Sequence, residues 1–288
     1  MTTSEKYALV TGCGRGGIGE ALVNEYKRRG IHAIATVLPA EASDHLEHAG
    51  ITFFPLDVTD EKSVLELKGH VEKLTDGRLD VLVNCAGIAY TMTAIDTDVA
   101  AVQRMFDINL FGPMRMVHHF HHLLIKAQGA IVNIGSIGGV IPYLYGSSYN
   151  ATKAGLHHWG NTLRVEMAPL NVRVITIISG EVSTNILKND AHRRLPKGSY
   201  YAPLAEEFHQ HVTRVPQGAT DRFQYAANVV TQSLSPSPPA WYWYGSYTGW
   251  TRFYDTFGWR TIWDSTLWKW FNLRKLQQAH EANVKRGL

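Results

Sequence analysis

A glycine-rich loop between a short apolar segment and a helical pattern is the feature of this sequence that most constrains its fold. The apolar segment is Lys6–Gly12, the helical pattern covers Glu20–Arg29, and the loop between them contains Gly12, Gly14, Gly16, Gly17 and Gly19. Glycines let the backbone approach a pyrophosphate, and the start of the following helix presents unpaired N–H groups to that anion. We therefore predict a strand–turn–helix unit that binds a dinucleotide, in preference to an ordinary turn.

Apolar strand segments alternate with helical patterns along most of the chain. Further strands are expected at His32–Leu38, Thr52–Val58, from Asp80–Val83 onward, Gly129–Ser136, Val172–Ser179 and Trp241–Tyr244, and helices at Glu61–Leu74, Tyr149–Ala168 and Phe223–Ser233. The strand that begins at Asp80 is apolar throughout its core, as strands buried on both faces of a parallel sheet are. This alternation predicts an α/β fold with a doubly wound parallel sheet.

The chain divides into a main domain and an aromatic tail. Residues 1–245 are assigned to the α/β domain, with a polar, irregular substrate lid at about 185–217, and residues 246–288 to a C-terminal extension. Seven of the eight tryptophans lie between Trp241 and Trp270. The tail is interpreted as a helix packed on the domain or a subunit interface, or alternatively as a segment whose rings enter a lipid surface.

Composition excludes several classes of protein. A net charge of +3 over 288 residues, without a basic run, does not favour nucleic acid as a partner. The N-terminus reaches a strand too early for a signal peptide, and no apolar run approaches the ~20 residues of a membrane span. A cytoplasmic protein is expected, with peripheral contact with endoplasmic reticulum or lipid droplets left open by the tail. No metal is expected, although His118, His119, His121 and His122 lie close together in sequence.

Three polar side chains near the middle of the chain have the chemistry of acid–base catalysis. Ser136 ends an apolar strand, and Tyr149 and Lys153 follow on a predicted helix, one turn apart on one face. An ammonium beside a phenol stabilises the phenolate and lowers the pKa of the phenol from its usual value of about 10. Such a phenol can exchange a proton with a carbonyl or alcohol oxygen near neutral pH.

Other residues at strand ends fit a cofactor. Asp57 could meet an adenine edge, and the small residues of Asn84–Gly87 leave room for a ligand. The second strand ends at Leu38 without the acidic residue that would bind ribose hydroxyls or an arginine for a 2′-phosphate. Because Arg15 in the glycine loop supplies a cation and no carboxylate is expected there, NADP is favoured over NAD.

Together these motifs resemble the short-chain dehydrogenase/reductase family over residues 6 to about 245. The family implies a Rossmann fold, a nicotinamide cofactor and a homodimer or homotetramer. By resemblance, Tyr149 is the general acid, Lys153 binds the nicotinamide ribose, Ser136 hydrogen-bonds the substrate oxygen and Asn109 holds a water in the proton relay. Cofactor contacts are implied for Gly12, Arg15, Gly17, Ile18, Gly19, Asp57, Val58, Asn84, Ala86, Gly87, Tyr149, Lys153, Gly180, Val182 and Thr184. The glycine loop has one residue more than the commonest family spacing, and Ser179 replaces a usual proline.

The segments TGCGRGGIGEAL, IPYLYGSSYNATKAGL and SPSPPAWYWYG are more narrowly similar to fungal 1-acyldihydroxyacetone-phosphate reductases and related secondary-metabolite enzymes. The resemblance implies NADP-dependent reduction of an apolar, lipid-like or secondary-metabolite ketone, with acyl-dihydroxyacetone phosphate among the candidates. Two alternatives are a non-redox isomerase, dehydratase or cyclase that keeps the cofactor as a scaffold, and a noncatalytic binding protein.

Overall fold

Seven parallel strands form one central sheet in the computed structural model, which describes residues 5–286. The strand order is β3-β2-β1-β4-β5-β6-β7. Their bounds are β1 Tyr7–Val10, β2 His32–Val37, β3 Thr52–Pro55, β4 Val81–Asn84, β5 Ala130–Ile134, β6 Arg173–Ser179 and β7 Trp241–Tyr244. The predicted doubly wound parallel sheet is confirmed.

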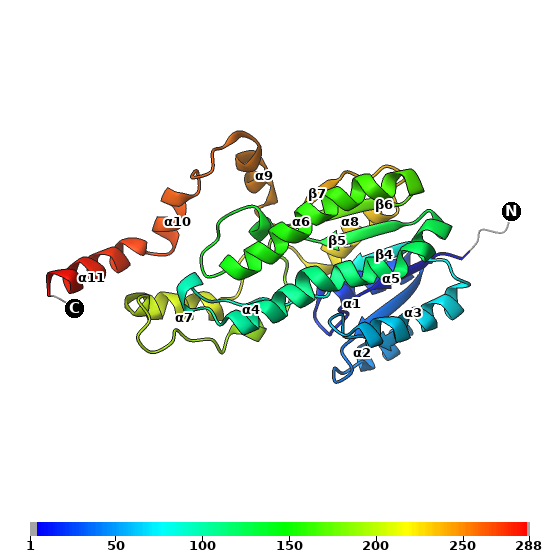
Figure 1. Ribbon diagram of the computed structural model, residues 1–288, viewed down its shortest axis with the longest axis horizontal. Coiled ribbons are helices and arrows are strands. Elements are labelled where there is room, and N and C mark those ends of the chain that lie inside the picture. Colours follow the sequence, from blue (N-terminus) through cyan, green and yellow to red (C-terminus); the bar gives the residue numbers. More distant parts are fainter. Residues whose placement is uncertain (1–4, 287–288) are drawn as a thin grey trace.

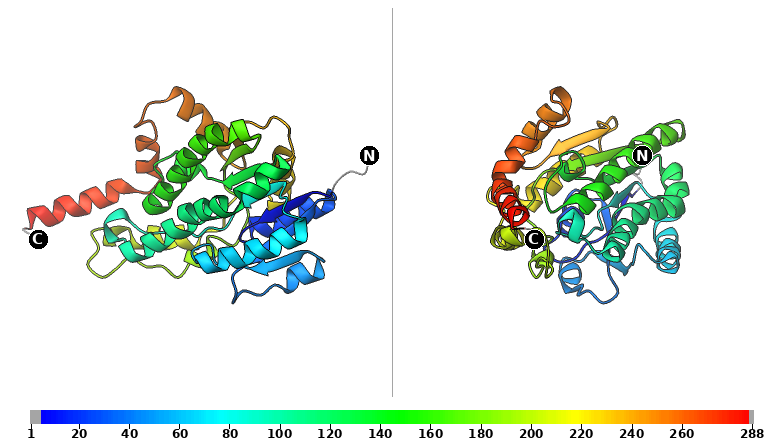
Figure 2. Two further views of the ribbon diagram at one scale, coloured as in Figure 1. Left: turned by 45° about the vertical axis from the view of Figure 1, so that its right-hand side comes forward. Right: turned by 60° about the vertical axis from the view of Figure 1, so that its left-hand side comes forward.

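Helices cover both faces of the sheet (Figures 1 and 2). Side chains of β1 alternate between these faces: Ala8 and Val10 join a core cluster with one helix layer, while Leu9 joins the opposite cluster. The first layer contains α1 (Ile18–Arg28), α2 (Asp44–His48) and α8 (Arg222–Ser233), and the second contains α3 (Glu61–Thr75), α5 (Gly112–Ala127) and α6 (Ser147–Met167).

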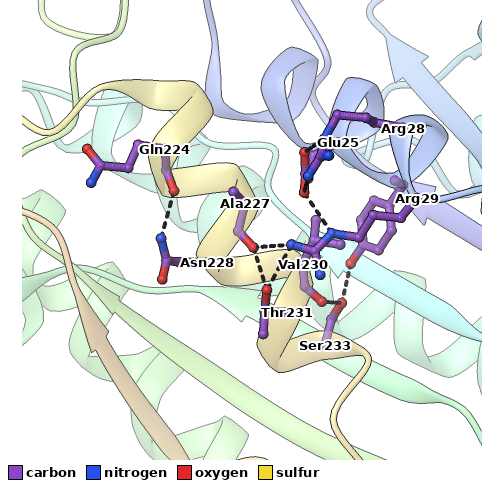
Figure 3. Close-up of polar contacts among 10 residues, drawn as sticks. Glu25, Arg28, Arg29, Gln224, Ala227, Asn228, Val230, Thr231 and Ser233 are labelled. Carbon is purple, nitrogen blue, oxygen red and sulfur yellow. Dashed lines mark hydrogen bonds and ion pairs between the residues drawn. The ribbon is translucent and has the colours of Figure 1, made fainter.

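The helix that follows the glycine loop is fixed by α8 (Figure 3). At the end of α1, Arg29 donates to the carbonyl oxygen of Ala227 at 2.7 Å and to Thr231 Oγ1 at 2.8 Å. Glu25 accepts from the guanidinium of Arg29 at 2.7 Å and so holds it in place. These contacts set the direction in which the start of α1 points.

Asn109 lies in an irregular part of the second helix layer. It belongs to a π-helical segment, Asp107–Phe111, between α4 (Val99–Phe106) and α5. Single π-helical turns are frequent at functional sites.

The lid and the tail differ from the sequence prediction. Within the lid, α7 (Ala205–Thr213) is a regular helix, so the expectation of irregular structure is wrong for these residues. The near-helical spacing of aromatic residues from Trp259 to Phe271 predicted one helix, and the tail instead forms α9 (Thr248–Phe257), α10 (Asp264–Trp270) and α11 (Leu273–Lys285). The break after α9 follows Gly258, which caps that helix with an extended backbone.

A third core cluster joins the lid to the tail. Phe208 of α7 packs with Leu267 and Phe271 of the tail and with Tyr145 of the loop after β5. Glu207 of the same helix accepts hydrogen bonds at 2.9 Å from Lys275. The α10 segment therefore packs on the main domain, whereas α11 has no buried residue and extends away from the sheet (Figure 1). No helix between residues 5 and 286 is long and apolar enough to cross a membrane.

Candidate active site

A cavity of about 1270 Å³ lies at the carboxyl edge of the sheet. Its walls come from the glycine loop, the ends of β2, β4, β5 and β6, the lid and the tail. Most of the predicted site residues line it: Gly12, Arg15, Gly17, Ile18, Asp57, Val58, Ala86, Gly87, Ser136, Tyr149, Lys153, Gly180, Val182 and Thr184. Gly19, Asn84 and Asn109 stand behind the wall, where they support its shape.

The glycine loop has the geometry of a phosphate cradle. Gly12 has a φ of +73°, and a Cβ there would lie 2.7 Å from the Cα of Ala86. A Cβ on Gly19 would lie 2.3 Å from the carbonyl oxygen of Gly12. Gly17 caps α1 without a side-chain acceptor, so the first N–H groups of that helix keep their capacity to bind an anion. These residues fit the pyrophosphate of a dinucleotide.

Two carboxylates approach the expected adenosine end of the cavity. Arg15 forms an ion pair with Asp44 at the start of α2. Glu41 lines the cavity, and its Oε1 lies 2.0 Å from the position that a Cβ on Gly14 would take. The expectation that no carboxylate follows β2 near this end is therefore wrong, because the loop after β2 folds back over the glycine turn.

Asn84 is a structural residue of the sheet edge. It is 3% exposed, and its Nδ2 donates to Asn133 Oδ1 of β5 at 2.9 Å. This bond joins the ends of β4 and β5 below the cavity. The predicted direct cofactor contact of Asn84 stays a prediction.

Ser136, Tyr149 and Lys153 converge beside the end of β5. A Cβ on Gly138 would lie 3.3 Å from Ser136 Oγ and 3.4 Å from Tyr149 Cε1. The ammonium of Lys153 lies 5.7 Å from the centroid of the Tyr149 ring, and it donates to the carbonyl oxygen of Ile134 at 2.9 Å. The helix α6 thus presents the phenol and the amine to one side, as the four-residue spacing predicts.

The protonation states of this group follow from burial. Burial raises the pKa of Tyr149, and the hydroxyl of Ser136 offsets part of that rise. Burial also lowers the pKa of Lys153 to about 8. The expected lowering of the phenol's pKa is therefore wrong for this arrangement. A phenol with a raised pKa is protonated at neutral pH and can serve as a proton donor.

Asn109 fixes the wall next to Lys153. Its Oδ1 accepts from the backbone N–H of Ile88 at 2.9 Å, and its Nδ2 donates to the carbonyl oxygen of Ile88 at 2.9 Å and to Thr152 Oγ1 at 3.1 Å. The amide is 1% exposed. Its side chain therefore joins the segment after β4 to α6.

Aromatic residues of the lid, the tail and the loop after β5 form part of the cavity wall. His211 of α7 lies 5.5 Å from the ring of Phe271 and 5.7 Å from that of Tyr143, measured between centroids. The tail adds Trp250, Tyr254, Trp263 and Trp270 to the cavity lining. Sequence reasoning missed these wall positions, although the aromatic spacing of the tail indicated a buried face.

The four histidines of α5 contact carboxylates and one another. His119 pairs with Glu61, and His122 Nε2 lies 2.8 Å from Glu72 Oε1. Among residues 5–286, no three His, Cys, Asp or Glu side chains gather as metal ligands would. Cys13 and Cys85 are free thiols.

The comparisons with known proteins agree on one family. A family model described as short chain dehydrogenase matches residues 6–195. The short-chain dehydrogenase fogD of Aspergillus ruber is 77% identical over 283 residues, which cover 98% of this chain and 99% of that protein. The NADPH-dependent 1-acyldihydroxyacetone phosphate reductase of Schizosaccharomyces pombe is 41% identical over 204 residues, 69% of each chain.

Solved structures agree on the fold. A short chain dehydrogenase of Burkholderia cenocepacia in complex with NADP has a TM-score of 0.71 at 20% identity, covering 93% of this chain and 99% of that chain. The predicted Rossmann fold and the resemblance to fungal relatives are confirmed. The chain belongs to the short-chain dehydrogenase family of oxidoreductases.

Proposed function

We propose that this protein reduces a ketone to a secondary alcohol with NADPH, and that Tyr149 is the general acid. The observation that carries the proposal is the convergence of Ser136, Tyr149 and Lys153 on a cavity whose other end is a glycine cradle. When bound, the nicotinamide supplies the hydride that forms the new C–H bond. The phenol of Tyr149 gives its proton to the carbonyl oxygen, and Ser136 Oγ hydrogen-bonds that oxygen while negative charge develops on it.

Lys153 and Asn109 support this step. As an ammonium, Lys153 binds the ribose of the cofactor and stabilises the phenolate that remains after proton transfer. Asn109 holds the backbone of Ile88 beside Lys153, and we propose that the same turn binds the water that returns a proton to Tyr149.

NADP is the proposed cofactor. The relative in Schizosaccharomyces pombe is named as NADPH-dependent, and the structural neighbour in Burkholderia cenocepacia binds NADP. In this chain Arg15 lines the cavity beside the glycine loop, and Arg104 lines it near Asp57. The partner of Arg15, Asp44, is exposed, so the ion pair can open toward a 2′-phosphate.

The proposed substrate is apolar and bulky. Part of the cavity wall is built from aromatic rings: Tyr143 of the loop after β5 and Trp250, Tyr254 and Trp263 of the tail. One ion pair, between Arg214 and Glu181, lies among them at 3.0 Å. Because Arg214 is already paired, a long apolar or aromatic ketone suits this wall better than a small charged one.

Replacing Tyr149 by Phe tests the proposed acid. The Tyr149→Phe variant is expected to lose NADPH oxidation with ketones such as 2-decanone and acetophenone, and to bind NADPH with unchanged affinity in a fluorescence titration. Tyr242→Phe, which removes a phenol of β7 outside the cavity lining, is the matched control and should retain activity. Full turnover by Tyr149→Phe would refute the assignment. A wild-type protein that converts substrates without consuming NADPH would instead support a non-redox reaction.

We also propose that the tail makes peripheral contact with membranes. Phe253, Phe257 and Trp259 are 51%, 75% and 69% exposed, and the first two lie about one turn apart on α9. Exposed aromatic rings of this kind favour the lipid interface. Changing these three residues to Ser leaves the buried face of α10 intact. The triple variant should lose flotation with phosphatidylcholine–phosphatidylserine vesicles, and equal flotation would contradict the proposal.

A further inference from the structure

A buried histidine lies directly behind the predicted catalytic serine. His157 is on α6, one turn beyond Lys153, and is 2% exposed. Its Nε2 accepts a hydrogen bond from the backbone N–H of Ser136 at 3.2 Å. The helix face that presents Tyr149 and Lys153 to the cavity therefore also reaches the backbone of the third member of the group.

The end of the strand ladder explains why Ser136 needs this partner. Pairing between β5 and β6 ends with Ile134 opposite Ile177, and the N–H of Gly135 makes the last bond, to the carbonyl oxygen of Ile177 at 2.8 Å. Ser136 is the first residue past the ladder. The Ser136 N–H is partly buried, and a fully buried N–H without an acceptor costs about 1–3 kcal/mol. The imidazole therefore replaces the missing strand partner.

The turn after β5 is shaped around the imidazole ring. A Cβ on Gly135 would lie 2.4 Å from His157 Nε2, and a Cβ on Gly139 would lie 2.5 Å from His157 Cε1. Neither glycine has a positive φ, so the space occupied by the ring, and not the backbone conformation, excludes a side chain there. The two glycines thus hold the ring edge against the N–H of Ser136.

The ring is held as a neutral acceptor. Trp241 of β7 packs against it with centroids 5.3 Å apart, and the indole N–H of Trp241 is fixed by Asn161 Oδ1 at 2.7 Å. Burial, together with a smaller effect of the charge of Lys153, lowers the pKa of His157 to about 3. Because Nε2 accepts, the neutral ring carries its proton on Nδ1, which is buried and has no hydrogen-bond partner among residues 5–286.

We propose that His157 is a positioning residue for the reaction: it fixes the backbone of Ser136 and thereby aims Ser136 Oγ at the substrate oxygen. This inference rests on the proposed role of Ser136. The serine is the N-cap of the following turn, and its Oγ also accepts from the N–H of Gly138 at 3.0 Å. With its backbone fixed by His157 and its Oγ held by Gly138, the hydroxyl has one preferred direction, which preorganises it for a developing oxyanion.

A matched pair of variants tests the inference. His157→Gln keeps a side-chain acceptor, and His157→Met replaces it with an apolar chain of similar length. We expect His157→Met to lower kcat for the best ketone by about tenfold, as the loss of one buried hydrogen bond predicts. His157→Gln should recover most of that loss, and neither variant should change the Kd for NADPH. If His157→Met does not fold, His157→Phe gives the same comparison with a ring in place.

Two further measurements separate positioning from general destabilisation. In a Ser136→Ala background, His157→Met should have almost no additional effect on kcat, because the hydroxyl that it aims is gone. Amide exchange measured by NMR should show the Ser136 N–H protected in the wild type and in the Gln variant, and faster in the Met variant. Unchanged protection and unchanged kcat in His157→Met would overturn the inference, as would an undiminished effect in the Ser136→Ala background. If the wild type is inactive on all ketones while amide exchange of Ser136 still depends on His157, the proposed function is refuted. The hydrogen bond between His157 and the Ser136 N–H is not.

Discussion

The phenol oxygen of Tyr225 lies 2.5 Å from Ser179 Oγ, and both side chains are buried. Ser179 ends β6 immediately before Gly180, which leads toward the lid, and Tyr225 belongs to α8. The family pattern usually has proline at this position, which could not accept from or donate to the phenol. The substitution in this chain therefore comes with a hydrogen bond that ties the start of the lid to the helix layer under the glycine loop.

Removing both partners of this bond is expected to cost less free energy of unfolding than the sum of the two single removals. Ser179→Ala leaves the Tyr225 hydroxyl buried without that partner and should lower the free energy of unfolding by about 1–3 kcal/mol. Tyr225→Phe should cost a similar amount, and the double variant should cost clearly less than the sum. Urea unfolding of the four proteins measures the cycle. Additive losses would show that the two hydroxyls do not interact.

The strands and the grouping of Ser136, Tyr149 and Lys153 could be predicted from sequence because their signals are local. Apolar runs define the strands, and parallel topology brings the ends of those strands to one edge, where Ser136 meets Tyr149 and Lys153. The four-residue spacing on α6 needs no tertiary information. The role of His157 was missed, although the same spacing places it one turn beyond Lys153.

The walls of the cavity depend on contacts between distant segments. Tyr145 meets Phe271 with centroids 5.3 Å apart, although 126 positions separate them (271 − 145). No periodicity within either segment specifies that meeting. A weak signal existed for α7, since Phe208 and Val212 are apolar residues four apart in a polar stretch, and both are buried. The approach of Glu41 to the glycine loop depends on a turn after β2 that composition did not indicate.

The preference for NADPH over NADH should depend on the ion pair between Arg15 and Asp44. Arg15→Ala is expected to raise the KM for NADPH while leaving that for NADH nearly unchanged, because only NADPH carries the 2′-phosphate. Asp44→Asn frees the guanidinium and should lower the KM for NADPH by about two- to fivefold, the range of exposed ion pairs. Steady-state kinetics with both cofactors measure the ratio. Equal changes in the KM for NADPH and the KM for NADH in Arg15→Ala would contradict this role of Arg15.

The tail should be required for the packing of the lid on the main domain. Phe271 is 7% exposed and packs against Tyr143 and His211, so Phe271→Ala should cost about 3 kcal/mol of stability. The same change should raise the KM for the ketone and speed tryptic cleavage near Arg214. Phe257→Ala, at a ring that is 75% exposed, is the control and should leave stability unchanged. Equal stability of both variants would show that the tail does not support the lid.

Binding of NADPH should weaken above about pH 8. Burial lowers the pKa of Lys153 to about 8, so its ammonium, which we propose binds the cofactor ribose, is lost above that pH. Fluorescence titration from pH 6 to 10 should show a Kd that is constant on the acid side and rises on the alkaline side. Lys153→Met should bind weakly at every pH without this inflection. If the inflection persists in the Lys153→Met variant, the pH dependence of NADPH binding belongs to another group.

Acid should destabilise the fold through two imidazoles, the buried His157 and the half-buried His211. Burial lowers the pKa of His157 and of His211 to about 3, below the 6.5 of an unfolded histidine. The unfolded chain therefore binds two protons that the folded chain does not. Stability from these groups is fully present above about pH 6.5 and is lost as the pH falls toward 3, by about 1.4 kcal/mol per pH unit for each group.

Replacing His211 by Phe keeps an aromatic ring in place and removes one of the two titrating imidazoles. His211→Phe remains among Tyr143, Tyr145 and Phe271 but cannot titrate, so the slope of unfolding free energy against pH should become shallower by about 1.4 kcal/mol per unit between pH 6 and 4. Urea unfolding at a series of pH values measures that slope, and the comparison at pH 7.5 gives the stability difference before titration begins. A slope identical to that of the wild type would mean that His211 already binds its proton in the folded protein. Carboxylates that titrate in the same range contribute equally to both proteins, so the difference between the two slopes belongs to His211 alone.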